Sequence, residues 1–158
     1  MIYFAAGVVI LIIDLLTKIW AQTRLRGIGT IPLIEGVFHL TYVENRGAAF
    51  GIMQDRRIFF VLITIVFLAA VVYVILKFKN RPAVLSLGLS FMTAGALGNM
   101  IDRIWRGFVV DMFDFRAINF PVFNVADIFV CIGAGLLAIF FIFCEGKEQE
   151  REDNSKNR

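Results

Sequence analysis

Residues 58–76 read IFFVLITIVFLAAVVYVIL and contain no charged side chain. An apolar stretch of about 20 residues is long enough to cross the ~30 Å hydrocarbon core of a bilayer as an α-helix. The many β-branched and aromatic residues do not argue against a helix, because backbone groups in lipid must be hydrogen-bonded internally. We therefore predict a transmembrane helix in this segment and interpret it as scaffold.

Three further segments reach the same length, at residues 2–22, 83–101 and 125–144. Hydrophobic residues make up 59% of the 158-residue chain, well above the roughly 45–50% that is usual for soluble domains. The predicted fold class is an all-α membrane protein with four transmembrane helices. We expect residues 1–144 to form one membrane domain and the charged residues 145–158 to form a polar, disordered tail. The first segment lacks a basic leader and a cleavage site, so it should remain a span and not a signal peptide.

Successive transmembrane helices run in opposite directions, and this alternation places the unusual polar residues on one side of the membrane. In a four-span chain, the end of span one, the start of span two, the end of span three and the start of span four share one side of the membrane. The connections 23–57 and 102–124 lie on that side too, whereas the opposite side carries the termini and a short turn. The polar residues predicted to gather there are Asp14, Lys18, Asn99, Asp102, Arg103 and Asp127.

Basic residues give the chain an orientation. The short turn carries Lys77, Lys79 and Arg81, and short loops rich in Lys and Arg stay in the cytoplasm. We therefore expect both termini and the tail in the cytoplasm, and the polar residues near the outer face of the membrane.

Two extended stretches are expected on that outer face. VFHLTYV, residues 37–43, alternates large apolar side chains and predicts a strand, and GFVVDMFDF, residues 107–115, is a second extended piece. Together they predict a small extracytoplasmic β segment and a loop on the membrane surface. Asn45 and Gly47 follow the first strand, and a glycine there would let the backbone approach a ligand closely.

Charged side chains inside spans are costly, about 2.5–3.5 kcal/mol at mid-helix, and indicate either function or pairing. Asp14 and Lys18 are four residues apart on one helical face, so they can form an ion pair. Two interpretations of them stay open: a structural ion pair, or a group that binds a polar substrate backbone or fixes neighbouring loops. Asp102 beside Arg103 is interpreted as structural support, and Asn99 can hydrogen-bond to another helix.

Asp111 and Asp127 differ from the other acidic residues, because neither has a basic residue within four positions and both fall where apolar segments meet water. Two carboxyl groups that lie close together share one proton, so one can donate while the other accepts. Aspartic proteolysis uses such a pair: one carboxylate activates water and the other polarises the scissile carbonyl. Asn124 is either the N-cap of the last helix or a direct part of this site.

Other kinds of site are disfavoured by composition. His39 is the one histidine and lies in the predicted strand, and the serines at 86, 90 and 155 lie away from the polar end, so no Ser-His-Asp triad is expected. No HExxH motif or Cys/His cluster offers a zinc site, so neither metal nor cofactor is expected. Lys and Arg form no basic stripe, which argues against a nucleic-acid partner.

Five stretches in order resemble the bacterial lipoprotein signal peptidase family, signal peptidase II: DLLTK (14–18), ENRGAAFG (44–51), GALGNMIDR (95–103), GFVVDMFDF (107–115) and FNVADIF (123–129). The resemblance covers about residues 1–144. It implies a membrane-embedded aspartic endopeptidase that removes signal peptides from prolipoproteins, cutting before a cysteine that carries diacylglycerol.

The resemblance also implies roles and partners. Asp111 and Asp127 take the catalytic positions, and Asp14 takes one that matters for activity or stability, with Lys18 completing its motif. The implied partners are lipid-modified prolipoproteins and membrane phospholipid, in the bacterial cytoplasmic membrane, and a monomer suffices for the mechanism. Arg116 could contact phospholipid head groups, although a snorkelling arginine is the simpler interpretation. The positions implied to shape the site or contact substrate are Asn45, Gly47, Asn99, Arg103 and Asn124.

Two other functions remain as alternatives. Acidic residues in spans also bind ions, as in a small ion- or proton-coupled transporter, but here they gather on one side, beside strand-like connections that suit a polypeptide substrate. In a non-catalytic assembly factor, Asp111 and Asp127 would be replaceable.

Overall fold

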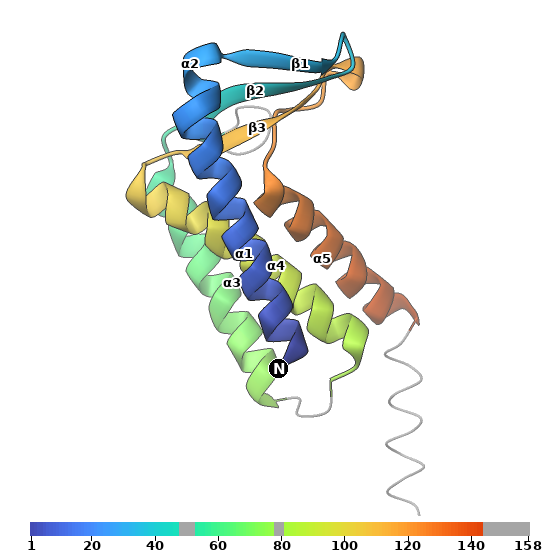
Figure 1. Ribbon diagram of the computed structural model, residues 1–158. Coiled ribbons are helices and arrows are strands. Elements are labelled where there is room, and N and C mark those ends of the chain that lie inside the picture. Colours follow the sequence, from blue (N-terminus) through green and yellow to red (C-terminus); the bar gives the residue numbers. More distant parts are fainter. Residues whose placement is uncertain (48–52, 78–80, 144–158) are drawn as a thin grey trace, which may run out of the picture.

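The structure, a computed structural model, describes residues 1–47, 53–77 and 81–143. Its helices form a bundle with a small sheet at one end (Figure 1). Within these ranges four helices are long and apolar enough to cross a membrane, which confirms the four predicted segments. The expected tail at 145–158, Lys79 of the short turn and residues 48–51 of the second motif lie outside the described residues. The four helices are α1 (Ile2–Trp20), α3 (Arg57–Lys77), α4 (Ala83–Trp105) and α5 (Val125–Phe143).

Two helices run further than the hydropathy pattern predicts. α1 continues through a π-helical turn, η1 (Ala21–Leu25), into a short helix, α2 (Arg26–Ile28). Both ends of η1 are fully buried in a core shared with Val110 and Met112, so tertiary packing holds this polar extension in a helix. α4 likewise runs past residue 101, because the charged residues of its last turns have buried partners.

The three-stranded sheet consists of β1 (Thr30–Ile34), β2 (Phe38–Asn45) and β3 (Val109–Phe115), in that order and antiparallel throughout. The two strands expected from the sequence are present as β2 and β3. β1 was not predicted, since Pro32 interrupts its pattern. Proline is tolerated there because β1 is an edge strand.

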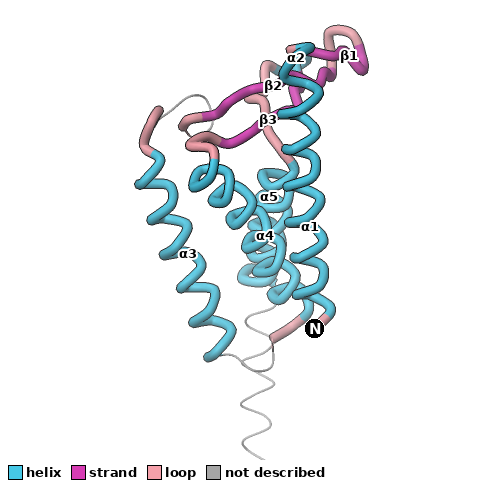
Figure 2. Tube along the Cα trace, turned by 60° about the vertical axis from the view of Figure 1, so that its left-hand side comes forward, coloured by secondary structure: helices cyan, strands magenta, loops and turns pink. Residues whose placement is uncertain are grey.

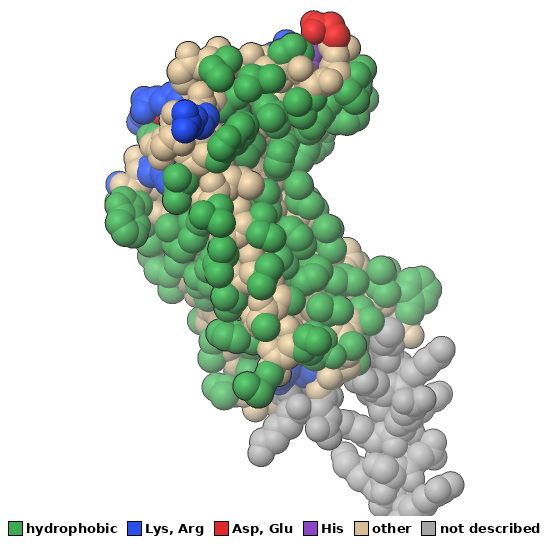
Figure 3. Space-filling view, viewed as in Figure 1, with side chains coloured by type: hydrophobic (Ala, Val, Ile, Leu, Met, Phe, Trp, Pro, Cys, Tyr) green, Lys and Arg blue, Asp and Glu red, His purple; other side chains and the backbone are tan. Residues whose placement is uncertain are grey.

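The sheet covers the end of the bundle opposite residue 1 (Figures 1 and 2). Ala21 and Leu25 of η1 pack against Val110 and Met112 of β3, and this core joins sheet to bundle. Hydrophobic side chains cover the helices on the face shown in Figure 3, as lipid-facing helices require. In the same view the surface is hollowed between the sheet and α5.

α4 and α5 pack closely because glycines remove side chains from the contact. A Cβ at Gly95 would overlap the Ala126 carbonyl, and a Cβ at Gly133 would lie 2.6 Å from Cγ of Met92. The close approach brings the last third of α4 beside the first turn of α5, where the predicted site residues lie.

Candidate active site

The fold brings the predicted polar residues together at the sheet end. Asp111 lies in β3, and Asn45 ends the neighbouring strand β2. Asp127 lies in the first turn of α5. α1 supplies Asp14 and Lys18, and α4 supplies Asn99, Asp102 and Arg103. The prediction from the alternating helix directions that these residues share one end of the molecule is therefore confirmed.

The start of α5 is built by a reciprocal cap. The Asn124 side-chain oxygen accepts a hydrogen bond from the Asp127 backbone N–H at 3.0 Å. Asp127 Oδ2 accepts one in return from the Asn124 backbone N–H at 3.2 Å. This capping box satisfies backbone donors that a helix start otherwise leaves free, and a carboxylate is favoured at the positive end of the helix dipole. Asn124 also donates from Nδ2 to Asp111 Oδ1 at 2.6 Å, so it is both a cap and a contact of the two aspartates.

Asp111 is almost fully buried and accepts a hydrogen bond at each oxygen. Asn124 donates to Oδ1, and Asn45 Nδ2 donates to Oδ2 at 2.9 Å. Burial first, and the charge of Asp127 second, raise the pKa of Asp111 to about 7, against the lowering effect of the two amide donors. Desolvation thus outweighs the hydrogen bonds, and the carboxyl group loses its proton only as the pH rises through about 7.

Asp127 is bonded in the same way. Asn99 Nδ2 donates to Asp127 Oδ1 at 2.8 Å, and the backbone of Asn124 donates to Oδ2. Each of the four carboxyl oxygens of Asp111 and Asp127 therefore accepts a hydrogen bond from a surrounding group. Because Asn124 contacts both aspartates, it ties the two carboxyl groups into one unit, called here the dyad.

A buried ionic cluster lies behind the dyad. The Lys18 ammonium is 2.8 Å from Asp14 Oδ2 and 3.5 Å from Asp102 Oδ2, and all three side chains are 0% exposed. Asp14 accepts the backbone N–H of Ala126 at 2.8 Å, and Asp102 accepts that of Val110 at 3.0 Å. The cluster thereby fixes the backbone beside both members of the dyad.

Arg103, in the last turn of α4, contacts α3 and the residue Gly47 after β2. Its guanidinium is 4.6 Å from the centre of the Phe60 ring and donates to the Gly47 carbonyl at 3.1 Å. It also donates to the Asn99 carbonyl at 3.4 Å. Arg103 therefore anchors the backbone at Gly47, two residues after the end of β2.

Several contributors were not identified from the sequence. Arg106 is ion-paired to Asp102 and donates to Gln22 Oε1 at 3.0 Å. Its spacing of four residues from Asp102 on α4 was a usable signal, the same one that paired Asp14 with Lys18. The backbone donors of Val110 and Ala126 carry no signature in the residue types.

Among the residues that the structure describes, His39 lies apart from the dyad, in a turn-side contact of β2. In the described parts of the chain, no group of three or more His, Cys, Asp or Glu residues could hold a metal ion. His39 lies in β2 opposite Asp114, and its Nε2 accepts the Gly36 backbone N–H at 3.2 Å.

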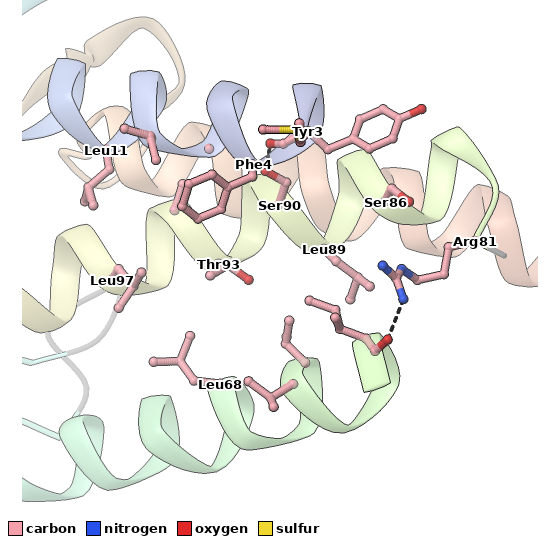
Figure 4. Close-up of a pocket in the computed structure, with 17 residues that line it drawn as sticks. Tyr3, Phe4, Leu11, Leu68, Arg81, Ser86, Leu89, Ser90, Thr93 and Leu97 are labelled. Atoms are coloured by element: carbon pink, nitrogen blue, oxygen red, sulfur yellow. Dashed lines mark hydrogen bonds between the residues drawn. The ribbon is translucent and has the colours of Figure 1, made fainter. Parts of the chain in front are cut away.

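A groove of about 620 Å³ lies at the other end of the bundle, between α1, α3 and α4 (Figure 4). Its walls are mainly apolar. Ser90, Thr93 and Arg81 contribute polar groups, and the Arg81 guanidinium donates to the Ile75 carbonyl at 2.6 Å. No residue of the dyad or of the ionic cluster lines this groove. The candidate active site is therefore the dyad with its surroundings.

Comparison with known proteins gives consistent matches along most of the chain. A family profile described as signal peptidase (SPase) II matches residues 6–143. The lipoprotein signal peptidase of Clostridioides difficile (strain 630) is 45% identical over 151 residues, covering 94% of this chain and 100% of that protein. The lipoprotein signal peptidase of Brevibacillus brevis is 44% identical over 146 residues, covering 92% and 97%. A bacterial membrane enzyme solved by the in meso method at 2.3 Å resolution is similar in fold, with a TM-score of 0.82 and 35% identity, covering 89% of this chain and 87% of that one.

Proposed function

The chain belongs to the signal peptidase II family, and on this premise we propose that it is an aspartic endopeptidase acting through Asp111 and Asp127. Its substrate is a prolipoprotein that carries diacylglycerol, and the cut falls before the lipid-modified cysteine. The observation that carries the proposal is the dyad: both carboxyl groups are bonded on every oxygen, and Asn124 contacts both.

The dyad suits general acid–base hydrolysis at neutral pH. With the pKa of Asp111 at about 7, this carboxyl group is protonated in about half of the molecules at pH 7. The protonated carboxyl group donates to the oxygen of the scissile carbonyl, and the ionised one takes a proton from water as the water attacks. When the tetrahedral intermediate collapses, the proton taken from water passes to the departing amine, and the proton lent to the carbonyl oxygen returns to the pair. No covalent bond forms between enzyme and substrate. The surrounding amide donors keep the negative charge of the pair stable in a site with little water.

The other residues of the site act around this pair in our proposal. Asn45, Asn99 and Asn124 orient the carboxyl groups, and Arg103 with Gly47 shapes the segment that meets the substrate. Asp102 is structural support, since it accepts a hydrogen bond from the backbone N–H of Val110, the second residue of β3. Asp14 and Lys18 shape the site from within the bundle, and their burial argues against direct contact with substrate.

We propose that the dyad faces outward from the bacterial cytoplasmic membrane, with both termini in the cytoplasm. One observation supports this orientation: Lys77 and Arg81 flank the short turn at the far end of the bundle from the sheet and the dyad. A signal peptide that is still in the bilayer could reach the dyad through the hollow between the sheet and α5 (Figure 3). Arg116, 44% exposed on its side chain, is placed to meet phospholipid head groups.

The test compares the purified protein with its Asp111→Asn and Asp127→Asn variants, reconstituted with a diacylglyceryl-modified prolipoprotein. Each variant should lose cleavage by about 10²–10⁴-fold, the range of general acid–base catalysis. Asp114→Asn is the matched control, because Asp114 lies three residues from Asp111 in the same strand and bonds to Thr41 and Arg116 instead.

Two results would contradict the proposal. Cleavage by either variant at the rate of the unsubstituted protein would exclude the dyad. A lack of cleavage by the unsubstituted protein would exclude the peptidase itself. A second substrate without the lipid tests whether diacylglycerol is required.

A further inference from the structure

Three asparagine side chains face the dyad, and each is oriented by a donor behind it. A side-chain amide has an oxygen that only accepts and a nitrogen that only donates. The Asn45 oxygen accepts the Gly47 backbone N–H at 2.9 Å, and the Asn124 oxygen accepts that of Asp127. The Asn99 oxygen instead accepts from the Lys18 ammonium at 2.9 Å.

These donors decide which end of each amide meets an aspartate. A backbone N–H and an ammonium group can only donate, so the amide oxygen must face them and the NH2 group must face away. All three NH2 groups therefore donate to the dyad, Asn45 and Asn124 to Asp111 and Asn99 to Asp127. Asn99 alone depends on a side chain, and that side chain comes from another helix.

Lys18 is held rigidly enough for this task. Its ammonium lies against three oxygens, those of Asn99, Asp14 and Asp102, and the side chain is 0% exposed. Lysine rarely lies fully buried unless it is paired. Ion pairing with Asp14 alone would neutralise its charge, so the contact with Asn99 is an additional feature that the pairing does not require.

We propose that Lys18 is a positioning residue for the dyad: its ammonium holds the Asn99 amide with the NH2 group towards Asp127. The inference rests on the proposed function, because it assumes that Asp111 and Asp127 perform the hydrolysis. Lys18 does not contact the substrate, since it has no exposed surface. Its effect reaches the reaction through Asn99.

Loss of the ammonium would remove the charged and closer of the two donors to the Asn99 oxygen. The remaining contact of the Asn99 oxygen is with Asn124 Nδ2 at 3.2 Å. If the amide rotated, its oxygen would face the Asp127 carboxyl group, and two acceptors would then oppose each other. The Asp127 carboxyl group would then be misplaced in the catalytic step, whereas the surface that binds the substrate would not change.

A double-mutant cycle tests this. Lys18→Met, Asn99→Ala and the double variant are purified, and kcat and KM are measured with a diacylglyceryl-modified prolipoprotein. Lys18→Met should lower kcat on the order of 10²-fold, as a misplaced catalytic group does, and leave KM within about twofold. In the Asn99→Ala background the same substitution should have little further effect, because residues that act through one another are not additive.

Asp14→Asn separates positioning from structural support. It removes an ion-pair partner of Lys18 and leaves the contact between Lys18 and Asn99, so its kcat should stay well above that of Lys18→Met at equal thermal stability. Lys18→Gln provides the second variant: its amide can still donate to Asn99, so part of the kcat should return. If the methionine variant does not fold, the cycle is run with Lys18→Gln, and the part of kcat that this variant loses should not be lost again in the Asn99→Ala background.

Additive losses of kcat in the cycle, or a Lys18→Met effect on KM alone, would overturn the inference. So would equal losses of kcat in Asp14→Asn and Lys18→Met. Failure of the proposed function is a different result, namely cleavage by Asp111→Asn or Asp127→Asn at the unsubstituted rate. If those two variants are inactive and the cycle is additive, only the role of Lys18 is excluded.

Discussion

At the scale of single residues, burial and hydrogen bonding have opposite effects on the pKa of Asp111, and their balance sets its protonation state. Two neutral amides donate to its oxygens, and a neutral hydrogen bond contributes a net ~1 kcal/mol. Removing a carboxylate from water beside a second acidic group costs more, so the pKa rises to about 7. A general acid that works at neutral pH needs this balance.

Burial of the Asp111 carboxyl group should therefore lower the free energy of unfolding as the pH rises above 3.8, and Asp111→Asn should remove this loss. The folded pKa of about 7 exceeds the ordinary value of 3.8, so between these values the folded protein binds a proton that the unfolded chain releases. The free energy of unfolding then falls as pH rises, by about 1.4 kcal/mol per pH unit, until about pH 7. The stability gained by Asp111→Asn should be about 2–3 kcal/mol larger at pH 8 than at pH 5.

Thermal unfolding in detergent at the two pH values measures this difference. The hydrogen bond lost in the variant is common to both pH values and cancels. Asp114→Asn is the control of opposite sign. Burial tends to raise the pKa of Asp114, but hydrogen bonds from Arg116 and Thr41 outweigh it and lower the pKa. Removal of that carboxylate should therefore cost stability at pH 8, and a pH-independent gain in Asp111→Asn would contradict the account.

The sequence predicted which polar residues gather at the sheet end, and it indicated the Asp14–Lys18 pair and the cap by Asn124, but not the other hydrogen bonds. Asp14, Lys18 and Asp127 stand out because charges are rare in apolar spans. The orientation of Asn99 depends on α1, α4 and α5 meeting at one point, and residue types alone do not encode that meeting. Arg106 was missed although its spacing from Asp102 indicated a pair.

At the scale of elements, hydropathy predicted the spans because lipid requires long apolar helices. It could not predict the extension of α1 to residue 28, which is held by packing of Ala21 and Leu25 against β3. Hydropathy also did not predict β1, because Pro32 interrupts its pattern. The strand forms nevertheless, because at the edge of the sheet the missing N–H of proline leaves no hydrogen bond unmade. The elements that the sequence did not predict are those that tertiary contacts hold in place.

The close packing of α4 and α5 gives a matched test. A Cβ at Gly133 would lie 2.6 Å from Met92 Cγ and 2.8 Å from the Gly88 carbonyl, whereas a Cβ at Gly135 would meet nothing within 4 Å. Gly133→Ala should destabilise the protein by about 1–3 kcal/mol, the usual cost of overpacking. Gly135→Ala, two residues away in α5, should be neutral or stabilise by up to about 1 kcal/mol, because alanine favours helix.

Thermal unfolding and cleavage are measured together for this pair. Separation of α4 from α5 would also move Asn99 away from Asp127, so Gly133→Ala should lose activity as well as stability. Equal behaviour of the two alanine variants would show that the two helices can move apart without cost.

At the scale of the whole molecule, the two ends of the bundle differ in charge and in chemistry. The sheet end holds the dyad and its amides. At the far end, Lys77 ends α3 and Arg81 precedes α4. A substrate whose signal peptide is still in the bilayer must be cut at one face of the membrane, so the orientation of the bundle decides which face.

Cysteine labelling in intact cells tests the proposed orientation. Glu35, exposed at the turn between β1 and β2, and Lys77, exposed at the end of α3, lie at opposite ends. In a Cys131→Ser, Cys144→Ser background that still cleaves substrate, Glu35→Cys should react with a membrane-impermeant maleimide added outside. Lys77→Cys should react only after permeabilisation, because short basic turns stay in the cytoplasm. The reverse pattern would place the dyad on the cytoplasmic face and would contradict the proposal that it cuts the substrate at the outer face.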